Sequence, residues 1–224
     1  MKCDCENCHI KNIFYASVTP EELDRYCSSR TERIVDEKET IIRQGAPITE
    51  FIYLKEGLVK LYRNTPAGAQ IISIGKPLDF VSLLNVFGDE KYSYSVSALH
   101  KSTVCVFDIN EIKKMILENG AFAFKLIKTM NKASDRVLFN YLDINQKRLF
   151  GRVAAVLLEF SSILNSDSYE LPISRKEISQ LVGMSIENVI RTISDLRKDK
   201  IIKVYGKNIE IIEKQRLIQI RDLN

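Results

Sequence analysis

Three cysteines near the N-terminus are the residues of this chain with the clearest capacity for chemistry. Cys3, Cys5 and Cys8 lie within six residues, and His9 follows directly. A cubane iron–sulfur cluster needs four thiolates, and a tetrahedral zinc site takes cysteine and histidine. A third interpretation is a disordered terminus whose thiols bind nothing. Spacing decides poorly between metals, so the choice depends on what the rest of the chain does.

A second set of candidate residues stands in SIENVIRTISDL, where Glu187 and Arg191 are four residues apart. On a helix this spacing puts both on one face, where they could form a surface ion pair or read DNA bases. Arginine donates twice to guanine O6 and N7, and glutamate accepts from cytosine N4. We favour base reading, because Ser185 suits a helix N-cap and Gly183 suits the turn before it. Two short helices joined in this way form a helix-turn-helix, whose second helix enters the major groove.

Neighbouring side chains extend the predicted DNA surface. Ile186 and Ile190 face outward beside the two readers and can contact thymine methyl groups. Ser174 and Glu177 form a capping box that begins the first helix, and IIKVYGKNIEII alternates around a turn as a hairpin wing does. The predicted phosphate contacts are the lysines of this region: Lys176, Lys198, Lys200, Lys203 and Lys207.

The composition fits a globular DNA-binding protein better than an enzyme. Of 224 residues, 45% are hydrophobic and 28% are charged, and the net charge is +4. Residues 146–224 hold 14 Lys and Arg against 10 Asp and Glu, whereas residues 1–145 hold 19 of each, so the whole excess lies in the last third. We find no apolar run as long as a membrane span, no signal peptide, and no nucleophile–base grouping or phosphate loop. We expect a cytoplasmic, non-enzymatic protein whose cysteines are thiols.

The rest of the chain predicts an α+β fold. Residues 33–107 consist of short β-rich runs broken by turn residues, the pattern of an antiparallel sandwich or roll. A long helix and a polar break at residues 142–150 follow, and the helix-turn-helix with its wing comes last. The predicted domains are a cysteine-rich arm, a β-roll, a dimerisation helix with its hinge and a winged helix-turn-helix, at residues 1–17, 18–118, 119–145 and 146–224.

Residues of the long helix repeat at alternating spacings of four and three, which is the a/d seam of a coiled coil. The seam consists of Leu126, Met130, Ala133, Val137, Asn140 and Ile144. Asn140 within it would set the register of a parallel homodimer. The alternative is a helix that packs only on its own domain, and we favour the seam because the repeat is strict.

The order of β-roll, seam helix, hinge, helix-turn-helix and wing resembles the CRP/FNR superfamily of bacterial transcription regulators, from about Val18 to Ile212. The family's DNA-reading motif is similar to EISQLVGMSIENVIRTISDL, and Glu187 and Arg191 match its readers. Ile190 stands where many members have Ser or Gly. The resemblance implies a jelly roll like the cyclic-nucleotide-binding domain, homodimers on pseudo-palindromic double-stranded DNA, and contact with RNA polymerase.

The effector is a separate question within this family. Members that bind cyclic AMP hold its phosphate with a Gly-Glu pair and an Arg-Ser pair, and the matching positions here are Ser82-Leu83 and Tyr92-Ser93. Without the arginine a buried phosphate would carry an uncompensated charge, so we predict that cyclic AMP is not the effector. The candidate residues of a less polar effector pocket, which could equally belong to the strand core or surface, are Leu83, Tyr92, Ser93 and Tyr94.

The same resemblance bears on the cysteines. Oxygen sensors of the FNR type bind an iron–sulfur cluster through N-terminal cysteines and one cysteine late in the roll, and Cys5, Cys8 and Cys105 resemble those positions. The next N-terminal ligand would fall on Phe14, and Cys3 is the alternative fourth thiolate. A cluster, a zinc ion and no metal therefore all stay open. Haem is a further alternative, although neither of the two histidines is singled out as an axial ligand.

Overall fold

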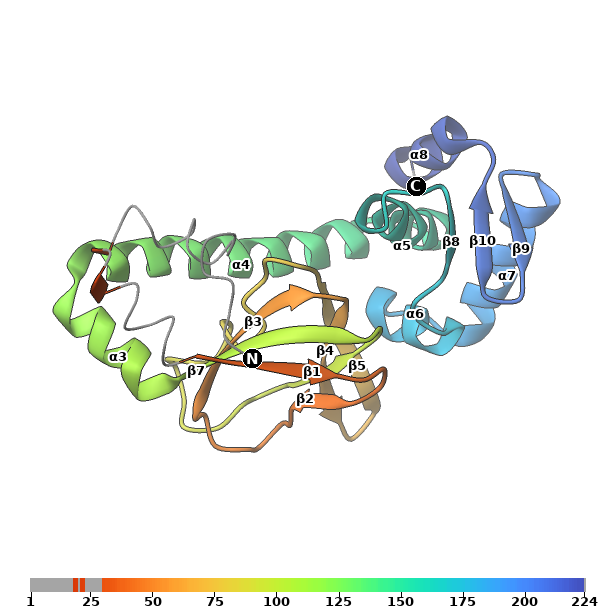
Figure 1. Ribbon diagram of the computed structural model, residues 1–224. Helices are drawn as coiled ribbons and strands as arrows, with labels where there is room; N and C mark the ends of the chain where they lie inside the picture. Colours follow the sequence, from red (N-terminus) through yellow and green to blue (C-terminus); the bar gives the residue numbers. More distant parts are fainter. Residues whose placement is uncertain (1–17, 20, 23–29, 224) are drawn as a thin grey trace. The chain divides into compact units, whose positions relative to one another are not determined.

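The computed structural model describes residues 18, 19, 21, 22 and 30–223, so the predicted arm with Cys3, Cys5 and Cys8 lies outside the described residues. The described chain divides into two compact units, whose elements are drawn in Figure 1. The first holds the described residues up to Ala67 and then Ile72–Arg136, and the second holds Gly68–Ile71 and the described residues from Val137 onward.

Two sheets of antiparallel strands make up the β-roll that the sequence predicted. One has the order β1-β7-β3, with β1 Thr31–Val35, β7 Ser102–Asp108 and β3 Glu50–Glu56. The other has the order β2-β6-β4-β5, with β2 Thr40–Ile42, β6 Ser95–Ala98, β4 Val59–Thr65 and β5 Gly68–Gly75. The turn between β3 and β4 requires glycine, because Gly57 has a φ of 94° and a Cβ there would lie 2.7 Å from the Ser102 Cα.

Strands β3 and β7 are buried on both faces, so their alternate residues enter two different cores. On one face of the two strands, the side chains pack against residues of the other sheet: Ile52, Leu54, Val104 and Val106. On the opposite face, the side chains pack against α3 and α4: Phe51, Tyr53, Cys105 and Phe107. The alternation of side chains along each strand thus supplies apolar residues to both cores. Cys105 is one of these core residues and lies on the central strand β7.

Two helices cover the second of these cores. α3 (Ile109–Glu118) contributes three buried side chains, and α4 (Gly120–Gln146) contributes Phe122 and Leu126 from its first two turns. The predicted long helix therefore exists, and its N-terminal part completes the core of the first unit.

The first half of the predicted coiled-coil seam packs on the core of its own unit, so the seam stays a prediction. Leu126 is 2% exposed in the core of its own unit, and Met130 and Ala133 pack against the same core. Leu126 therefore offers little surface to a second copy, whereas Met130 and Ala133 stay partly exposed. The remaining predicted seam residues are half-buried or exposed: Val137, Asn140 and Ile144.

Another face of α4 carries exposed apolar side chains. Phe124 and Ile127 are 59% and 52% exposed, and Leu138 and Tyr141 are 52% and 58% exposed. At about 100° per residue these four share one stripe, which lies roughly 100° around the helix from Leu126. We call Phe124, Ile127, Leu138 and Tyr141 the outer stripe.

The second unit is the predicted winged helix-turn-helix, which confirms the fold class. Its elements are α5 Leu149–Ile163, β8 Ser168–Glu170, α6 Arg175–Val182, α7 Ile186–Lys198, β9 Ile202–Tyr205, β10 Asn208–Ile211 and α8 Lys214–Leu223. The strands form a sheet of order β8-β10-β9. The helices share a buried core: Val153, Leu157, Phe160, Ile178, Val189 and Leu196. Although α5 is largely apolar, no helix of the described residues meets the length and hydropathy needed to span a membrane.

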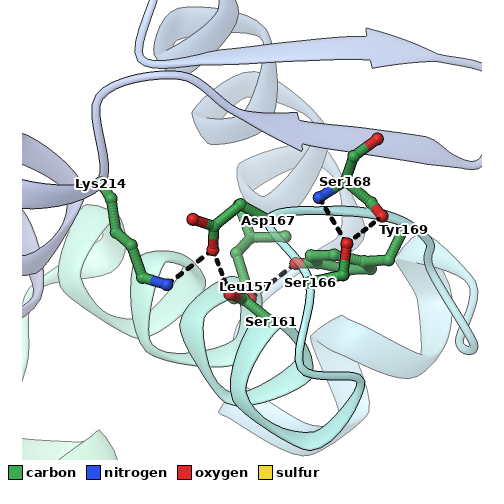
Figure 2. Close-up of polar contacts among 7 residues, drawn as sticks. All are labelled: Leu157, Ser161, Ser166, Asp167, Ser168, Tyr169 and Lys214. Carbon is green, nitrogen blue, oxygen red and sulfur yellow. Dashed lines mark hydrogen bonds and ion pairs between the residues drawn. The ribbon is translucent and has the colours of Figure 1, made fainter.

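A polar network fixes the loop that leads from α5 into β8 (Figure 2). The Asp167 carboxylate accepts hydrogen bonds from the Lys214 ammonium and the Ser161 hydroxyl, each at 2.6 Å. These two bonds, that of Lys214 first, hold the pKa of the Asp167 carboxyl below its ordinary value. The Tyr169 hydroxyl donates to the Leu157 carbonyl at 2.6 Å. The network joins α5, β8 and the start of α8.

Candidate DNA-binding surface

The turn between α6 and α7 is built by the caps that the sequence predicted. The Ser174 hydroxyl accepts from the Glu177 N–H at 3.2 Å, and the Glu177 carboxylate accepts from the Ser174 N–H at 2.8 Å. Gly183 ends α6 at a φ of 64°, in the left-handed region, and Ser185 then caps α7 by accepting from the Asn188 N–H at 3.3 Å. These local contacts set the angle at which α7 leaves α6.

One face of α7 is buried and the opposite face is exposed. Val189, Ile193 and Leu196 are at most 5% exposed, as the helical period predicted. Glu187, Arg191 and Ile190 are exposed, and Ile190 is 52% exposed. Ile186, at the first position of the helix, is half-buried. The predicted readers therefore lie together on the N-terminal half of the helix.

The two charged readers do not pair with each other within the described structure. The Arg191 guanidinium donates to the Asn188 side-chain oxygen at 2.9 Å. The Glu187 carboxylate bonds to its own backbone N–H and to the Ser185 hydroxyl, and these bonds lower its pKa. The two side chains therefore bond to other groups and do not form an ion pair with each other. Asn188 orients Arg191 and was missed by the sequence analysis, although its spacing of three residues was the available signal.

The hairpin wing formed by β9 and β10 turns at Gly206, whose φ is 61°. Lys207 at its tip is exposed, and its ammonium lies 3.6 Å from the Glu170 carboxylate of β8. An exposed pair of this kind is weak, so it leaves Lys207 available for a phosphate. The Arg175 guanidinium donates to the Gly206 carbonyl at 3.5 Å and connects the wing to the start of α6, beside the exposed Lys176.

The two halves of the chain match two known domain families. Residues 32–119 match the cyclic nucleotide-binding domain, and residues 151–220 match the Crp-like helix-turn-helix domain. The combination of these two domains in this order decides the family. The chain belongs to the CRP/FNR family of transcription regulators. As a CRP/FNR protein with this helix-turn-helix, it is a sequence-specific DNA-binding transcription regulator.

Relatives of this CRP/FNR protein extend over most of its length. The nitrogen fixation regulation protein FixK of Bradyrhizobium diazoefficiens is 26% identical, over 95% of this chain and 92% of its own. The transcriptional activator protein anr of Pseudomonas aeruginosa is 23% identical, over 93% of this chain and 88% of its own. The solved structure of FixK2 from Bradyrhizobium japonicum has a TM-score of 0.73 at 23% identity, over 85% of this chain and 96% of its own, and shares the fold.

Most of the predicted effector-pocket residues of this CRP/FNR protein are core residues. Leu83, Tyr92 and Tyr94 are 1%, 6% and 2% exposed. The Tyr92 hydroxyl donates to the Glu50 carbonyl at 2.7 Å, and the Tyr94 hydroxyl donates to the Val81 carbonyl at 2.9 Å. Burial raises the pKa of Tyr92 to about 12 and also raises that of Tyr94. The three side chains fill the core, and the two tyrosine hydroxyls bond to the backbone, so their part in an effector pocket stays a prediction.

Ser93, the fourth predicted pocket residue, is exposed, and its backbone N–H donates to the Asn85 side-chain oxygen at 2.6 Å. Asn85 is 8% exposed and also donates to the Asp89 carboxylate at 2.8 Å. It thus fixes the segment that carries the tyrosines. The sequence analysis missed Asn85, and its only signal was a single polar residue in the apolar run LLNVF.

Cys105 is the one cysteine in the described part of the chain, and it is fully buried. Its sulfur lies 4.0 Å from a carboxylate oxygen of Glu32, and the Lys55 ammonium donates to the same oxygen at 3.1 Å. Among the residues that the structure describes, no three His, Cys, Asp or Glu side chains are grouped so as to hold a metal. The iron–sulfur prediction needs the cysteines outside the described residues, so it stays a prediction, as do zinc and haem.

Proposed function

We propose that this regulator reads its DNA site with the outer face of α7. The observation that carries the proposal is the exposure of Glu187 and Arg191, unpaired with each other, on the N-terminal half of that helix. Arg191 would donate to guanine O6 and N7, and Glu187 would accept from cytosine N4. Ile190 and the half-buried Ile186 would contact thymine methyl groups beside them.

The contacts that position α7 on DNA would come from its flanks. Ser185 lies at the helix N-terminus, where backbone N–H groups and a hydroxyl favour a phosphate. Lys176 and Lys207 are exposed at the start of α6 and at the wing tip. Such contacts carry no sequence information, so they would set affinity and salt dependence while the α7 face sets specificity.

CRP/FNR regulators act as dimers, and we propose that this one dimerises through the outer stripe of α4. The stripe supplies four large exposed apolar side chains over about 25 Å of helix. Between them Asn131 and Ser134 continue the three–four spacing and are exposed. Two copies of Asn131 facing each other would set the register, the role that the sequence analysis gave to Asn140. A two-fold dimer would read a pseudo-palindromic site.

Four further parts of the proposal concern the effector, the partners, the absence of catalysis and the location. Leu83 and Tyr92 are buried at the positions where a cyclic-AMP phosphate would need its partners, which supports an effector other than cyclic AMP.

RNA polymerase is proposed as a partner on the family resemblance. The protein would act by binding rather than catalysis, and it would work in the cytoplasm, where the DNA of a bacterium lies.

The direct test is selection of binding sites from random duplexes by the full-length protein. We expect enriched sites to contain two inverted half-sites one helical turn apart, each with a guanine and a cytosine at fixed positions. Affinity should fall steeply with salt for selected and random duplexes alike. Selection of a single half-site, or no enrichment over random DNA, would contradict the proposal.

A further inference from the structure

Outside the DNA-reading face, the winged unit has a groove of about 560 Å³ at the C-terminal end of α7 and along β9. Its apolar lining consists of Ile202, Val204, Tyr205 and Ile212. Three cations also line it: Arg197, Lys200 and Lys203. A hollow that combines an apolar floor with a basic rim has the chemistry of a binding site for an amphipathic, acidic partner.

The floor of the groove includes large side chains that the unit leaves in contact with water. Tyr205 is 66% exposed and Ile212 is 40% exposed. Single exposed apolar residues are common on protein surfaces and carry no meaning alone. These two line one hollow, and tyrosine is enriched at protein interfaces because it offers a rigid apolar ring with a polar tip.

The groove runs along a sheet edge. The order β8-β10-β9 places β9 at the edge, and its recorded partner strand is β10, through pairs from Tyr205–Asn208 to Ile202–Ile211. On the outer side of an edge strand, alternate N–H and C=O groups point away from the sheet. A segment in extended conformation could add to β9 as a further strand and place alternate side chains on the floor.

The cations of the rim are available to a partner. Neither the Arg197 guanidinium nor the Lys200 ammonium forms an ion pair with another residue in the described ranges, whereas the Lys203 ammonium lies 3.3 Å from the Glu210 carboxylate. Lys200 has a φ of 58°, a conformation that favours glycine or asparagine, and the turn that holds it closes with the Ile201 N–H donating to the Leu196 carbonyl at 3.0 Å. A fixed turn therefore holds one of the two free cations beside the groove.

We propose that this groove binds an extended segment of another protein in which acidic and apolar residues alternate. The segment would pair with the edge of β9, place its apolar side chains on Tyr205 and Ile212, and bring its carboxylates to Arg197 and Lys200. DNA phosphate would use the cations but would gain nothing from the apolar floor. Along α7, Arg197 lies ten residues beyond Glu187 and six beyond Arg191, roughly 15 Å and 9 Å along the helix axis.

The test uses the full-length protein and a fluorescein-labelled peptide of about eight residues that alternates glutamate and valine, in fluorescence anisotropy. We expect saturable binding that weakens about tenfold or more in Arg197→Glu and in Ile212→Ser. The matched control is Arg216→Glu, which makes the same charge change at an exposed residue of α8 outside the groove and should leave peptide binding intact. A lysine–valine peptide, and a glutamate–valine peptide N-methylated at alternate residues, should bind about tenfold more weakly or not at all.

Three outcomes would overturn the proposal. One is no saturable binding by the wild-type protein up to about 1 mM peptide, or equal binding of the acidic and basic peptides. Another is displacement of the peptide by saturating duplex DNA, which would make the groove a phosphate contact. The third is a change in the oligomeric state of Ile212→Ser, which would make it an interface between copies. Peptide and DNA bound together, with the groove variants impaired for the peptide, would support the proposal.

Discussion

Leu138→Asp is expected to dissociate the homodimer while both units stay folded. Leu138 belongs to the outer stripe of α4 and is 52% exposed, so its replacement removes little from the core of the subunit itself. In a dimer formed through this stripe, each copy of Leu138 would pack against the opposite helix. The substitution would place one carboxylate from each subunit in that apolar contact.

The size of the effect follows from the exposed part of the side chain. Full burial of a leucine side chain stabilises by about 1.5–3 kcal/mol, and about half of this one is available to a partner, so the two copies together lose about 2 kcal/mol. Burying or protonating the two carboxylates adds a further ~1–3 kcal/mol. The sum of about 3–5 kcal/mol corresponds to a dissociation constant raised by roughly two to four orders of magnitude.

Sedimentation velocity over a range of protein concentrations measures this change. The matched control is Asn140→Asp, which adds the same charge at an exposed position of α4 outside the outer stripe and inside the predicted seam. It should leave the dimer nearly unchanged. A Leu138→Asp protein that remains dimeric at nanomolar concentration, or an Asn140→Asp protein that dissociates as strongly, would refute the assignment of the interface to the outer stripe.

Four other predictions concern DNA, stability and the effector. Arg191→Ala should cost about 1–3 kcal/mol per half-site and relax the preference at one base pair, whereas Lys207→Ala should weaken all duplexes alike and lower the salt slope by about one. Equal losses of Arg191→Ala on selected and random duplexes would exclude base reading. Leu126→Ala should lower the stability of the first unit by about 2–5 kcal/mol in thermal unfolding, and Leu138→Ala should lower it by less than about 1 kcal/mol, a contrast that equal values would contradict. The pKa of Asp167 is lower in the folded protein than in the unfolded chain, so its stabilisation is present above the unfolded value of about 3.9 and is lost as the pH falls through the folded value. Asp167→Asn should therefore unfold at a lower temperature than the wild type at pH 7, with the difference narrowing at pH 3, and a constant difference would show that the lost contact is not ionic. Calorimetry should detect no cyclic AMP binding at micromolar to millimolar concentration, and a saturable heat with tighter DNA binding would contradict the assignment of the effector.

The DNA-binding unit could be predicted in detail because its signals are local. Ser174 with Glu177, Gly183 and Ser185 form cap bonds with groups within four residues of themselves, so the sequence determines where α6 and α7 begin and end. The helical period then determines the buried and exposed faces of α7. The short β-rich runs and their turn residues likewise indicated the roll, although not the partner of each strand, because pairing depends on residues far apart in the chain.

The tertiary structure decided which face of α4 is free and what Tyr92 and Tyr94 do. The helix has two apolar stripes, and the sequence analysis assigned the dimer seam to the one that begins at Leu126. That stripe instead covers the core formed by β3, β7 and α3, because the aromatic side chains on that side of the sheet need an apolar partner. Tyr92 and Tyr94 are two residues apart, which puts them on one face of an extended segment, but a filled core and an open pocket have the same period. The choice depends on what the other sheet places opposite them, and only the folded chain brings those residues together.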